Sequence, residues 1–381
     1  MLRFLDAGES HGKCLLGIIE GLPAGFLINE DKINENLHRR QMGYGRGKRM
    51  LIEQDQVEIL SGVVSRKTIG SPIGLMIKNR DWKNVKKQNL TPLLIPRPGH
   101  ADLAGMIKYN FHDCRPVLER ASARQTAMKV AIGTVALQFL EFFKIYSYCH
   151  VKTIGNISLK DEPIFDEAFQ KKIQQSKVFC MDASISEEMC RQIDEAKKNG
   201  DTLGGIFEIA VKGVPIGLGS HVHWDRRLDG RLAAALMSIP GVKAVEIGNG
   251  IAASREKGSE VHDAIYRTDD ELDLSQKYFR KKNDAGGLEG GISNGETILL
   301  RAYFKPIPTL LNPLDSVNIK TGEKTKAMYQ RSDICVVPAA SVVGEAMVGW
   351  EIAAAFLEKF GGDSLREIEK NIQNYKRGLE K

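Results

Sequence analysis

Apolar and polar residues alternate along several segments of the chain with the period of two that is typical of half-buried β-strands. The clearest segments are VEILSGVV from position 57, GIFEIAVKGV from 205 and ETILLRAYF from 296. Two longer segments, ASARQTAMKVAIGTVALQFLEFF from 121 and SVVGEAMVGWEIAAAFLEKFGG from 341, are apolar around most of a helical circumference. Helices of this kind need cover on several sides, so we expect helices enclosed by β-sheets.

The order of these elements favours an α+β fold over a doubly wound sheet, because strands and helices do not alternate as regular βαβ units. A length of 381 residues suffices for two or three average domains or for one large domain. The chain has no Pro/Ser-rich linker, no low-complexity tract and no fixed-period repeat. The most polar stretch, at 255–284, mixes both charge signs, and we interpret it as a long excursion.

Four glycine-rich segments combine glycine with polar residues: GYGRG at 43–47, RPGHADLAG at 97–105, GLGSHVHWDRRLDGR at 217–231 and AGGLEGGISNGE at 285–296. Glycine clusters mark tight turns or places where the backbone comes close to a ligand. Any one of them could be an ordinary turn. Because all four carry His, Arg, Ser or Asn and are separated by apolar elements, we favour one site built from distant loops.

Composition and charge indicate the class of ligand. Hydrophobic residues make up 42% and charged residues 27%, which is ordinary globular usage and excludes wholesale disorder. The net charge of +6 is too small to indicate nucleic-acid binding, but it suits an anionic small substrate.

The six cysteines form no C-x-x-C pair, so we expect neither a disulfide framework nor a structural zinc site. The N-terminus lacks a signal-peptide pattern and no apolar run reaches membrane-spanning length, so we expect a cytoplasmic protein.

The most basic segment, HRRQMGYGRGKR at 38–49, holds five Lys and Arg residues and no acid. Arginine forks suit phosphate and carboxylate oxygens, and glycine allows close backbone approach. The segment is no Walker A loop, since Gly43 to Lys48 is one residue short and Arg49 stands where a Ser or Thr is needed. An RNA-binding arm is the alternative, but no aromatic stacking surface accompanies it. The pattern favours binding of a small anionic molecule.

Histidines in glycine-flanked turns are candidates for proton transfer. His11 lies in GESHG and His100 in RPGHAD, although a lone loop histidine is more often a bystander. His221 and His223 form H-x-H without a third ligand at a metal-binding spacing, so we interpret them as strand residues. We expect no metal.

Three further segments combine charge with a rigid start or turn. Arg120-Ala121-Ser122 opens the first long helix, where a phosphate seat and simple N-capping by Ser122 are equally plausible. Lys305 to Thr309 (KPIPT) follows a strand as a rigid polar turn, and Arg331-Ser332-Asp333 precedes the second long helix. Residue types alone therefore indicate a cytosolic enzyme with an anion-rich ligand set.

These motifs together resemble the chorismate synthase family, and the resemblance runs nearly end to end. The matching segments are GESHG, RRQMGYGRGKRM, VEILSGV, RPGHADL, LERASAR, GSHVHWDRRLDGRL, AGGLEGGISNGE and QRSDICVVPAA. The resemblance implies a single α+β domain over 1–381, with helices sandwiched between antiparallel sheets, usually assembled as a homotetramer. It implies conversion of 5-enolpyruvylshikimate 3-phosphate to chorismate with loss of phosphate, and a requirement for reduced FMN without net redox change.

The resemblance also implies roles for residues. His11 would protonate the departing phosphate, His100 would protonate or hold the reduced flavin, and Asp333 would handle the proton at flavin N5. Ser10 and Ser122 would supply supporting hydroxyl groups. The implied cofactor contacts are Arg40, Arg46, Arg120, Ala121, Ser122, Pro240, Gly241, Gly290, Lys305, Pro306, Ile307, Pro308, Thr309 and Arg331. The implied substrate contacts are Arg40, Arg46, Arg49 and Arg124.

Arg40 and Arg46 match positions that the family associates with NADPH, so they serve either that nucleotide or the substrate anions. Some members reduce their own flavin with NADPH and others depend on a separate reductase; the chain has the compact length of the dependent type. Departures are few: Gln125 replaces a usual acid, and Gly241 and Ala244 exchange small residues. Two other classes are disfavoured: an NTP-dependent phosphotransferase lacks its phosphate loop and metal-binding acids, and an RNA-binding protein would rest on the 39–49 arm alone.

Overall fold

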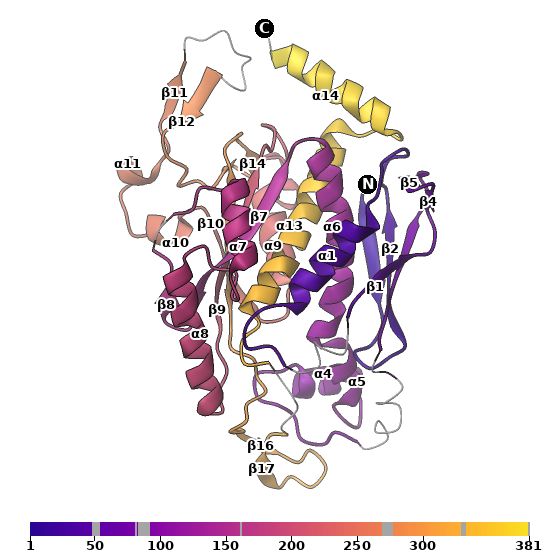
Figure 1. Ribbon diagram of the computed structural model, residues 1–381, viewed down its shortest axis with the longest axis vertical. Coiled ribbons are helices and arrows are strands. Elements are labelled where there is room, and N and C mark those ends of the chain that lie inside the picture. The colour runs from indigo at the N-terminus through magenta and orange to yellow at the C-terminus, as the bar shows by residue number, and fades with distance from the viewer. Residues whose placement is uncertain are drawn as a thin grey trace.

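The computed structural model describes residues 1–47, 54–80, 82, 92–160, 162–268, 277–328 and 333–379. Two long helices lie between two β-sheets (Figure 1). They are α6 (Thr126–Phe142) and α13 (Val337–Phe360). Nearly every residue of both helices is buried, as their all-round apolar pattern predicts. The α+β prediction is confirmed.

The first sheet has the strand order β1-β2-β6-β3 and packs against α6. Its strands are β1 (Arg3–Ala7), β2 (Cys14–Glu20), β6 (Ile73–Lys78) and β3 (Val57–Ile59), all paired antiparallel. The second sheet has the order β10-β15-β9-β7-β8 and packs against α13. Its strands are β10 (Val242–Ile247), β15 (Ile298–Phe304), β9 (Gly205–Lys212), β7 (Tyr146–Ile154) and β8 (Ile157–Ser158), again antiparallel.

Further helices cover the ends and sides of this sandwich. α1 (Glu30–Gln41) crosses α6 and α13, and α9 (Leu228–Met237) packs on α13 and β10. The remaining helices are α4 (Asp102–Tyr109), α5 (Arg115–Arg120), α7 (Glu167–Gln175), α8 (Ala183–Lys198), α10 (Gly250–Ala253), α11 (Gly258–Val261) and α14 (Leu365–Leu379).

Four two-stranded ribbons complete the described chain: β4 (Val63–Val64) with β5 (Lys67–Thr68), β11 (Ile265–Arg267) with β12 (Tyr278–Arg280), β13 (Leu288–Glu289) with β14 (Ile292–Ser293), and β16 (Asp315–Val317) with β17 (Lys324–Lys326). The β11–β12 ribbon projects from the body beside α11, and it belongs to the polar excursion predicted at 255–284 (Figure 1).

The predicted strands at 205 and 296 appear as β9 and β15, whereas the segment at 57 breaks into β3 and β4 because a turn at Ser61 and Gly62 interrupts it. The helix expected from 121 begins at Thr126. Ser122 has extended backbone geometry and caps a short 3-10 turn at Ala123–Gln125, which separates α5 from α6. The H-x-H pair is not in a strand as expected: His221 and His223 lie in an exposed loop before the turn at Trp224–Arg226.

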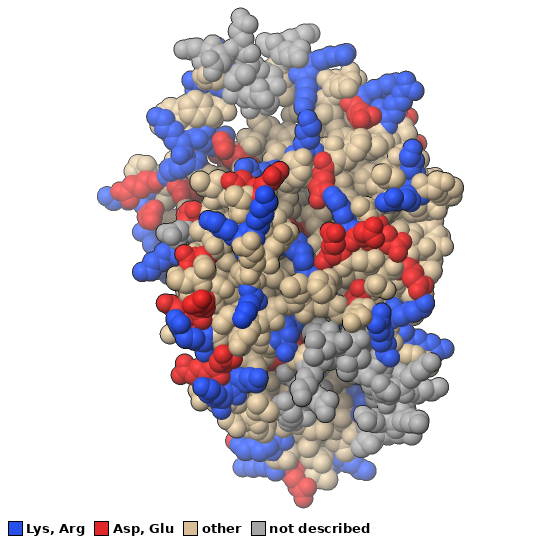
Figure 2. Space-filling model, in the orientation of Figure 1, with Lys and Arg blue, Asp and Glu red and all other residues tan. Residues whose placement is uncertain are grey.

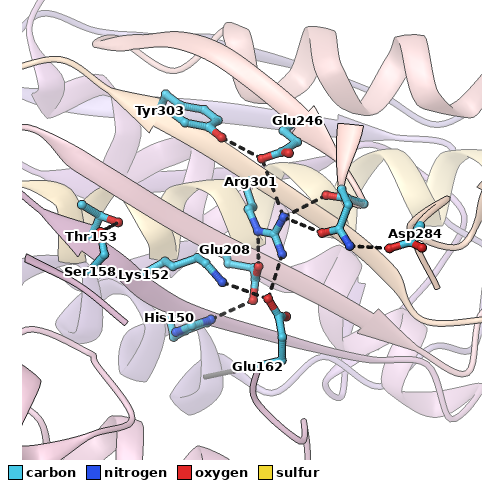
Figure 3. A network of polar contacts seen from close by, with 12 residues as sticks. His150, Lys152, Thr153, Ser158, Glu162, Glu208, Glu246, Asp284, Arg301 and Tyr303 are labelled. Atoms are coloured by element: carbon cyan, nitrogen blue, oxygen red, sulfur yellow. Dashed lines mark hydrogen bonds and ion pairs between the residues drawn. The ribbon is translucent and has the colours of Figure 1, made fainter. Parts of the chain in front are cut away.

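A buried row of charged residues crosses the second sheet (Figure 3). His150 of β7 pairs with Glu208 of β9 at 3.0 Å, and Glu208 accepts from Arg301 of β15 at 2.5 Å. Arg301 also lies 3.7 Å from Glu246 of β10 and donates to the Gly248 carbonyl. Burial would raise the pKa of Glu208, but its His150 and Arg301 partners outweigh burial and lower that pKa. Each charge thus has its opposite within the sheet.

α13 is the one helix among the described residues that is long and apolar enough to cross a membrane. Most of it is buried between the sheets, as in the core helix of a soluble protein, so this is weak evidence for a membrane span.

Glycines set the distance between α6 and α13. A Cβ atom on Gly133 of α6 would lie 2.3 Å from the carbonyl oxygen of Ala346, and one on Gly349 of α13 would lie 2.4 Å from Cδ2 of Leu137. Real Cβ atoms essentially never come so close, so the helices could not keep this separation with larger residues.

Gly133→Ala should therefore push α6 and α13 apart and lower the free energy of unfolding by about 1–3 kcal/mol, the usual range for an overpacked core. Gly230→Ala in α9 is the matched control, because its Cβ would meet nothing within 4 Å and the residue is exposed. Alanine's helix propensity should make that variant up to about 1 kcal/mol more stable. Urea denaturation of both variants measures the difference; equal stabilities would contradict the contact.

Candidate functional site

Several loops predicted to carry the site meet at the end of the sandwich where α6 and α13 begin (Figure 1). The turn after β1 reaches α5, since the Ser10 amide donates to the Glu119 carbonyl at 2.9 Å. The glycine loop after α1 reaches the start of α13, since the Ile334 amide donates to the Gly45 carbonyl at 2.8 Å. Segments from opposite ends of the chain thus form one surface.

His11 is held by Glu119, a residue that sequence reasoning did not select. The Glu119 carboxylate accepts from the His11 amide at 2.8 Å and lies 2.9 Å from His11 Nδ1. Burial would raise the pKa of Glu119, but both contacts with His11 outweigh burial and lower that pKa. A histidine fixed through Nδ1 by a carboxylate has a defined ring orientation, which suits proton transfer.

Ser10 connects this pair to the next group of side chains. Its hydroxyl lies 3.1 Å from the hydroxyl of Ser122, and the Ser122 hydroxyl accepts from the Arg124 amide at 3.2 Å. Asn79 accepts from Arg124 Nε at 2.8 Å and donates to the Gly12 carbonyl at 2.8 Å. The two predicted serines, His11 and Arg124 are therefore brought together.

Asp55 holds two of the predicted arginines in the interior. Its carboxylate accepts from Arg40 at 2.8 Å and from Arg124 at 2.5 Å, and its side chain is 0% exposed. Burial lowers the pKa of Arg40; Asp55 opposes this, and the nearby Arg124 and Arg46 add to it. Nε of Arg40 is buried and has no hydrogen-bond partner in the described part of the chain. The cations that act on Arg40 thus outnumber the acids that act on it.

Arg46 and Asp333 form the neighbouring pair. Arg46 lies 3.4 Å from the Asp333 carboxylate, which also accepts a hydrogen bond from the Gly47 amide. The loop is anchored on its other side, because the Tyr44 hydroxyl lies 3.0 Å from both carboxylate oxygens of Asp194 in α8. Gly45 has a φ of +85°, and a Cβ there would lie 2.8 Å from Ile193, so this turn requires glycine. Arg49, Arg331 and Ser332 lie outside the described residues.

His100 forms a second histidine–carboxylate pair. Its Nδ1 lies 2.5 Å from Asp102, which also accepts from Arg97 Nε at 2.8 Å. Burial would raise the pKa of Asp102, but hydrogen bonds from His100 and Arg97 outweigh burial and hold that pKa well below its usual range. Asp102 therefore stays ionised and keeps the imidazole in place.

The predicted cofactor segments fall into three groups. Lys305 donates to the Gly99 carbonyl beside His100, and its amide donates to the Gly241 carbonyl at 2.9 Å. The turns at 240–241 and 305–309 are thereby joined to the His100 loop. Within 305–309, the Ile307 carbonyl accepts a hydrogen bond from Thr202 and Thr309 is buried. Pro306 and Pro308 restrict the backbone of this turn.

The second group of predicted cofactor residues is centred on Arg120, and the third consists of Gly290. Arg120 pairs with Asp6 at 3.0 Å and donates to the Gly8 carbonyl, at the end of α5 where Ala121 is the C-cap. Gly290 has a φ of +60° in the turn of the β13–β14 ribbon, and its nearest side chain is His221. The described contacts do not join Gly290 to the rest of the site.

Sequence reasoning missed the carboxylates that orient the candidate side chains. Glu119 lies within LERASAR and Asp102 within RPGHADL. Their position inside motifs already selected was the signal by which they could have been found. Asp55 has no such signal, because it lies in a polar connection between α1 and β3.

On the face shown in Figure 2, Lys and Arg are interspersed with Asp and Glu. The described residues of this face therefore form no continuous basic stripe of the kind that nucleic-acid binding needs.

Three comparisons relate the chain to known proteins. The family model for chorismate synthase matches residues 2–357. The chain is 53% identical over 386 residues to a chorismate synthase of Pelobacter propionicus, covering 98% of each chain, and 51% identical over 390 residues to one of Caldicellulosiruptor saccharolyticus, covering 100% of each. A crystal structure of chorismate synthase superposes with a TM-score of 0.81 at 43% identity, covering 100% of this chain and 98% of the other.

Asp55→Asn should lower the free energy of unfolding by about 3–5 kcal/mol, because it leaves two buried guanidinium groups without their shared anion. Asp6→Asn is the matched control: its partner Arg120 is 45% exposed, so the loss should stay below about 1 kcal/mol. Thermal and urea unfolding of both variants tests the difference. A loss for Asp55→Asn no larger than that of the control would show that Asp55 does not hold the arginines.

Proposed function

The chain belongs to the chorismate synthase family, and we propose that the loops around Asp55, His11 and His100 form its active site. Its activity is that of a carbon–oxygen lyase, which converts 5-enolpyruvylshikimate 3-phosphate to chorismate with loss of phosphate in the shikimate pathway. The observation that carries the proposed site is the continuous set of contacts from His11 through Ser10, Ser122 and Arg124 to Asp55.

The arginine group suits the charges of this substrate, which carries one phosphate and two carboxylates. Arg40 has one acid, Asp55, and two further cations, Arg46 and Arg124, acting on it, so cations predominate around its guanidinium. Guanidinium groups held by carboxylates present fixed forked donors, which bind oxyanions without further ordering. We assign substrate binding to these three arginines together with Arg49.

His11 is the proposed general acid at the departing phosphate. Glu119 lies 2.9 Å from Nδ1 of His11 and holds the imidazole in one orientation, which a positioned proton donor requires. Ser10, adjacent to His11 and within hydrogen-bond reach of Ser122, orients the same end of the substrate. Phosphate is a better leaving group once protonated, so this placement lowers the barrier to carbon–oxygen cleavage.

The family implies a reduced flavin, and the chain's residues fit such a group. Lys305, Arg120 and the backbone of the 240–241 turn offer cations and peptide groups to a flavin phosphate and ring edge. Arg120, Ala121, Ser122, Pro240, Gly241, Gly290, the Lys305–Thr309 turn and Arg331 would hold it. When bound, reduced FMN supplies electron density that assists phosphate departure and is returned by the end of the turnover.

His100 and Asp333 are the proposed acid–base groups on the flavin side. Asp102 holds His100 in a loop that Lys305 fastens to the proposed cofactor turn. Asp333 is fixed by the Gly47 amide and Arg46, so its carboxylate is oriented toward the same end of the sandwich. Each group is therefore restrained before any ligand arrives.

We assign Arg46 to substrate, with NADPH or a separate reductase supplying electrons to the flavin elsewhere. Its pairing with Asp333 and its proximity to Arg40 join it to the substrate group.

A single domain over 1–381 is supported by the main hydrophobic core, whose buried residues range from Leu2 to Ile368; a second, small cluster holds Leu93, Cys114 and Leu118. A cytoplasmic location is supported by the six cysteines, all of which are free.

A homotetramer is supported by the outer face of the first sheet. Leu5 pairs in register with Ile18 and is 75% exposed, and Leu16 and Ile18 are also exposed. The ion pairs Arg3–Glu20 and Lys78–Glu58 border this apolar face. Apolar faces rimmed by charge are typical of protein–protein interfaces.

His11→Ala should lower turnover by about 10²–10⁴-fold, the contribution of a well-placed general acid, while FMN affinity stays close to native. Glu119→Gln keeps His11 but weakens the contacts that orient its ring, so it should lower turnover less than His11→Ala. Anaerobic assays with pre-reduced FMN and saturating substrate measure both variants. Near-native turnover of His11→Ala would sink the assignment.

Arg46→Ala should raise the Michaelis constant for substrate about ten- to a hundredfold, as expected when one charge-assisted hydrogen bond worth about 1.5–3 kcal/mol is lost. The assay uses dithionite-reduced FMN, so that no nucleotide is required. Unchanged substrate kinetics under these conditions would assign Arg46 to NADPH instead.

A further inference from the structure

Lys129 is a half-buried cation on α6 that neither the motifs nor the proposed site accounts for. It lies one turn after the helix begins, and its Nζ donates to the carbonyl and the hydroxyl of Ser238 at 3.3 and 3.4 Å. Both contacts are long for an ammonium donor, whose charge-assisted bonds are usually about 2.7–2.9 Å. Ser238 ends α9, and a cation at a helix C-terminus is one plain explanation for this lysine.

The charged neighbours of Lys129 indicate a second role, in binding an anion. Its electrostatic neighbours are Asp6 and Arg120, and Asp6 is already paired with Arg120 at 3.0 Å. Burial lowers the pKa of Lys129; Asp6 opposes this shift and Arg120 adds to it. Among the described residues, two cations therefore share one carboxylate, so one positive charge lacks a described counter-charge.

Lys129 connects α6 to the segment that leads into the proposed cofactor turn. Arg120 ends α5 on one side, and Ser238 leads through Ile239 into the Pro240-Gly241 turn on the other. That turn is fastened to Lys305 by the 2.9 Å bond between the Lys305 amide and the Gly241 carbonyl. The unbalanced charge thus lies between the groups proposed above for the flavin.

We propose that Lys129 is a further cofactor-binding residue, whose ammonium group contacts an anionic part of the reduced flavin; this rests on the proposed function. Two parts of that cofactor are anionic: the phosphate, and the N1–C2 carbonyl edge of the ring in its reduced form. Positive charge beside that edge stabilises the reduced ring relative to the oxidised one, which is how a protein tunes a flavin.

The test replaces Lys129 by Met, which keeps the length of the side chain and removes the charge; Lys129→Gln serves in its place if the Met variant does not fold. Lys129→Arg keeps the charge, and Lys243→Met on β10 is the matched control, since Lys243 is exposed. Dissociation constants are measured by anaerobic absorbance titration for FMN and riboflavin, each in oxidised and reduced form, without substrate.

Loss of one charge-assisted contact should weaken binding by Lys129→Met about ten- to a hundredfold, with Lys129→Arg and Lys243→Met close to native. A loss for FMN but not for riboflavin identifies the phosphate as the partner. A loss for both that is larger in the reduced state identifies the ring edge. Native affinity of Lys129→Met for every ligand would overturn the proposal. Equal weakening for FMN and riboflavin in both oxidation states would overturn it too, because it would indicate that Lys129 only stabilises the end of α9. If the native protein bound neither form of FMN, the proposed flavin site itself would fail.

Discussion

The close contact between α6 and α13 is the constraint on which the site depends. Gly133 packs against the Ala346 carbonyl, and Gly349 packs against Leu137. These close contacts allow only one distance between the two helix backbones and only one alignment of one helix along the other. Both helices begin at the same end of the sandwich, and each is continuous with a loop of the site: Ser122–Gln125 before α6, and Asp333–Val336 before α13 (Figure 1). A shift of one helix along the other would move Arg124 away from the Arg46–Asp333 pair. The core therefore fixes the distance between Arg124, which precedes α6, and the pair of Arg46 with Asp333, which precedes α13.

Two buried arginine groups in this protein illustrate the difference between a structural and a functional use of charge. Arg301 is surrounded by Glu208, Glu162 and Glu246; burial lowers its pKa, the acids outweigh burial, and the net pKa is raised (Figure 3). Arg40 has one acid and two cations near it, and its pKa is lowered. In the first group the acids outweigh burial, and its contacts tie four strands together. Around Arg40 the cations outnumber the acids that act on it, an imbalance that an anionic ligand can offset and that distinguishes the site from the sheet.

The sequence predicted what depends on local pattern and missed what depends on contacts between distant residues. The all-round apolar character of α6 and α13 follows from the sequence, as does the need for cover on both sides. The start of α6 did not follow, because Ser122 is followed by a helix-compatible sequence and only the contact between Ser10 and Ser122 shows why the chain bends there. His11 and His100 were found as histidines in glycine turns. Their carboxylates were not. Glu119 is 108 residues from His11 and gives no periodic signal, whereas Asp102 lies 2 residues from His100 and was not singled out within RPGHADL.

The same imbalance of charge has a thermodynamic consequence. Burying Arg40 costs free energy, because its guanidinium loses water and has one acid, Asp55, against two nearby cations, Arg46 and Arg124. The positive ends of α6 and α13 lie nearby and add to the potential that opposes this arrangement. The free energy comes from the glycine-spaced helical core, which is rigid enough to hold the guanidinium groups in place. A bound oxyanion reduces the repulsion between the arginines and also forms its own hydrogen bonds with them. The reduced repulsion therefore adds to the binding free energy of the anion. A fold that buried the same arginines with matching acids, as the sheet does around Arg301, would be more stable and would have no such gain to offer a ligand.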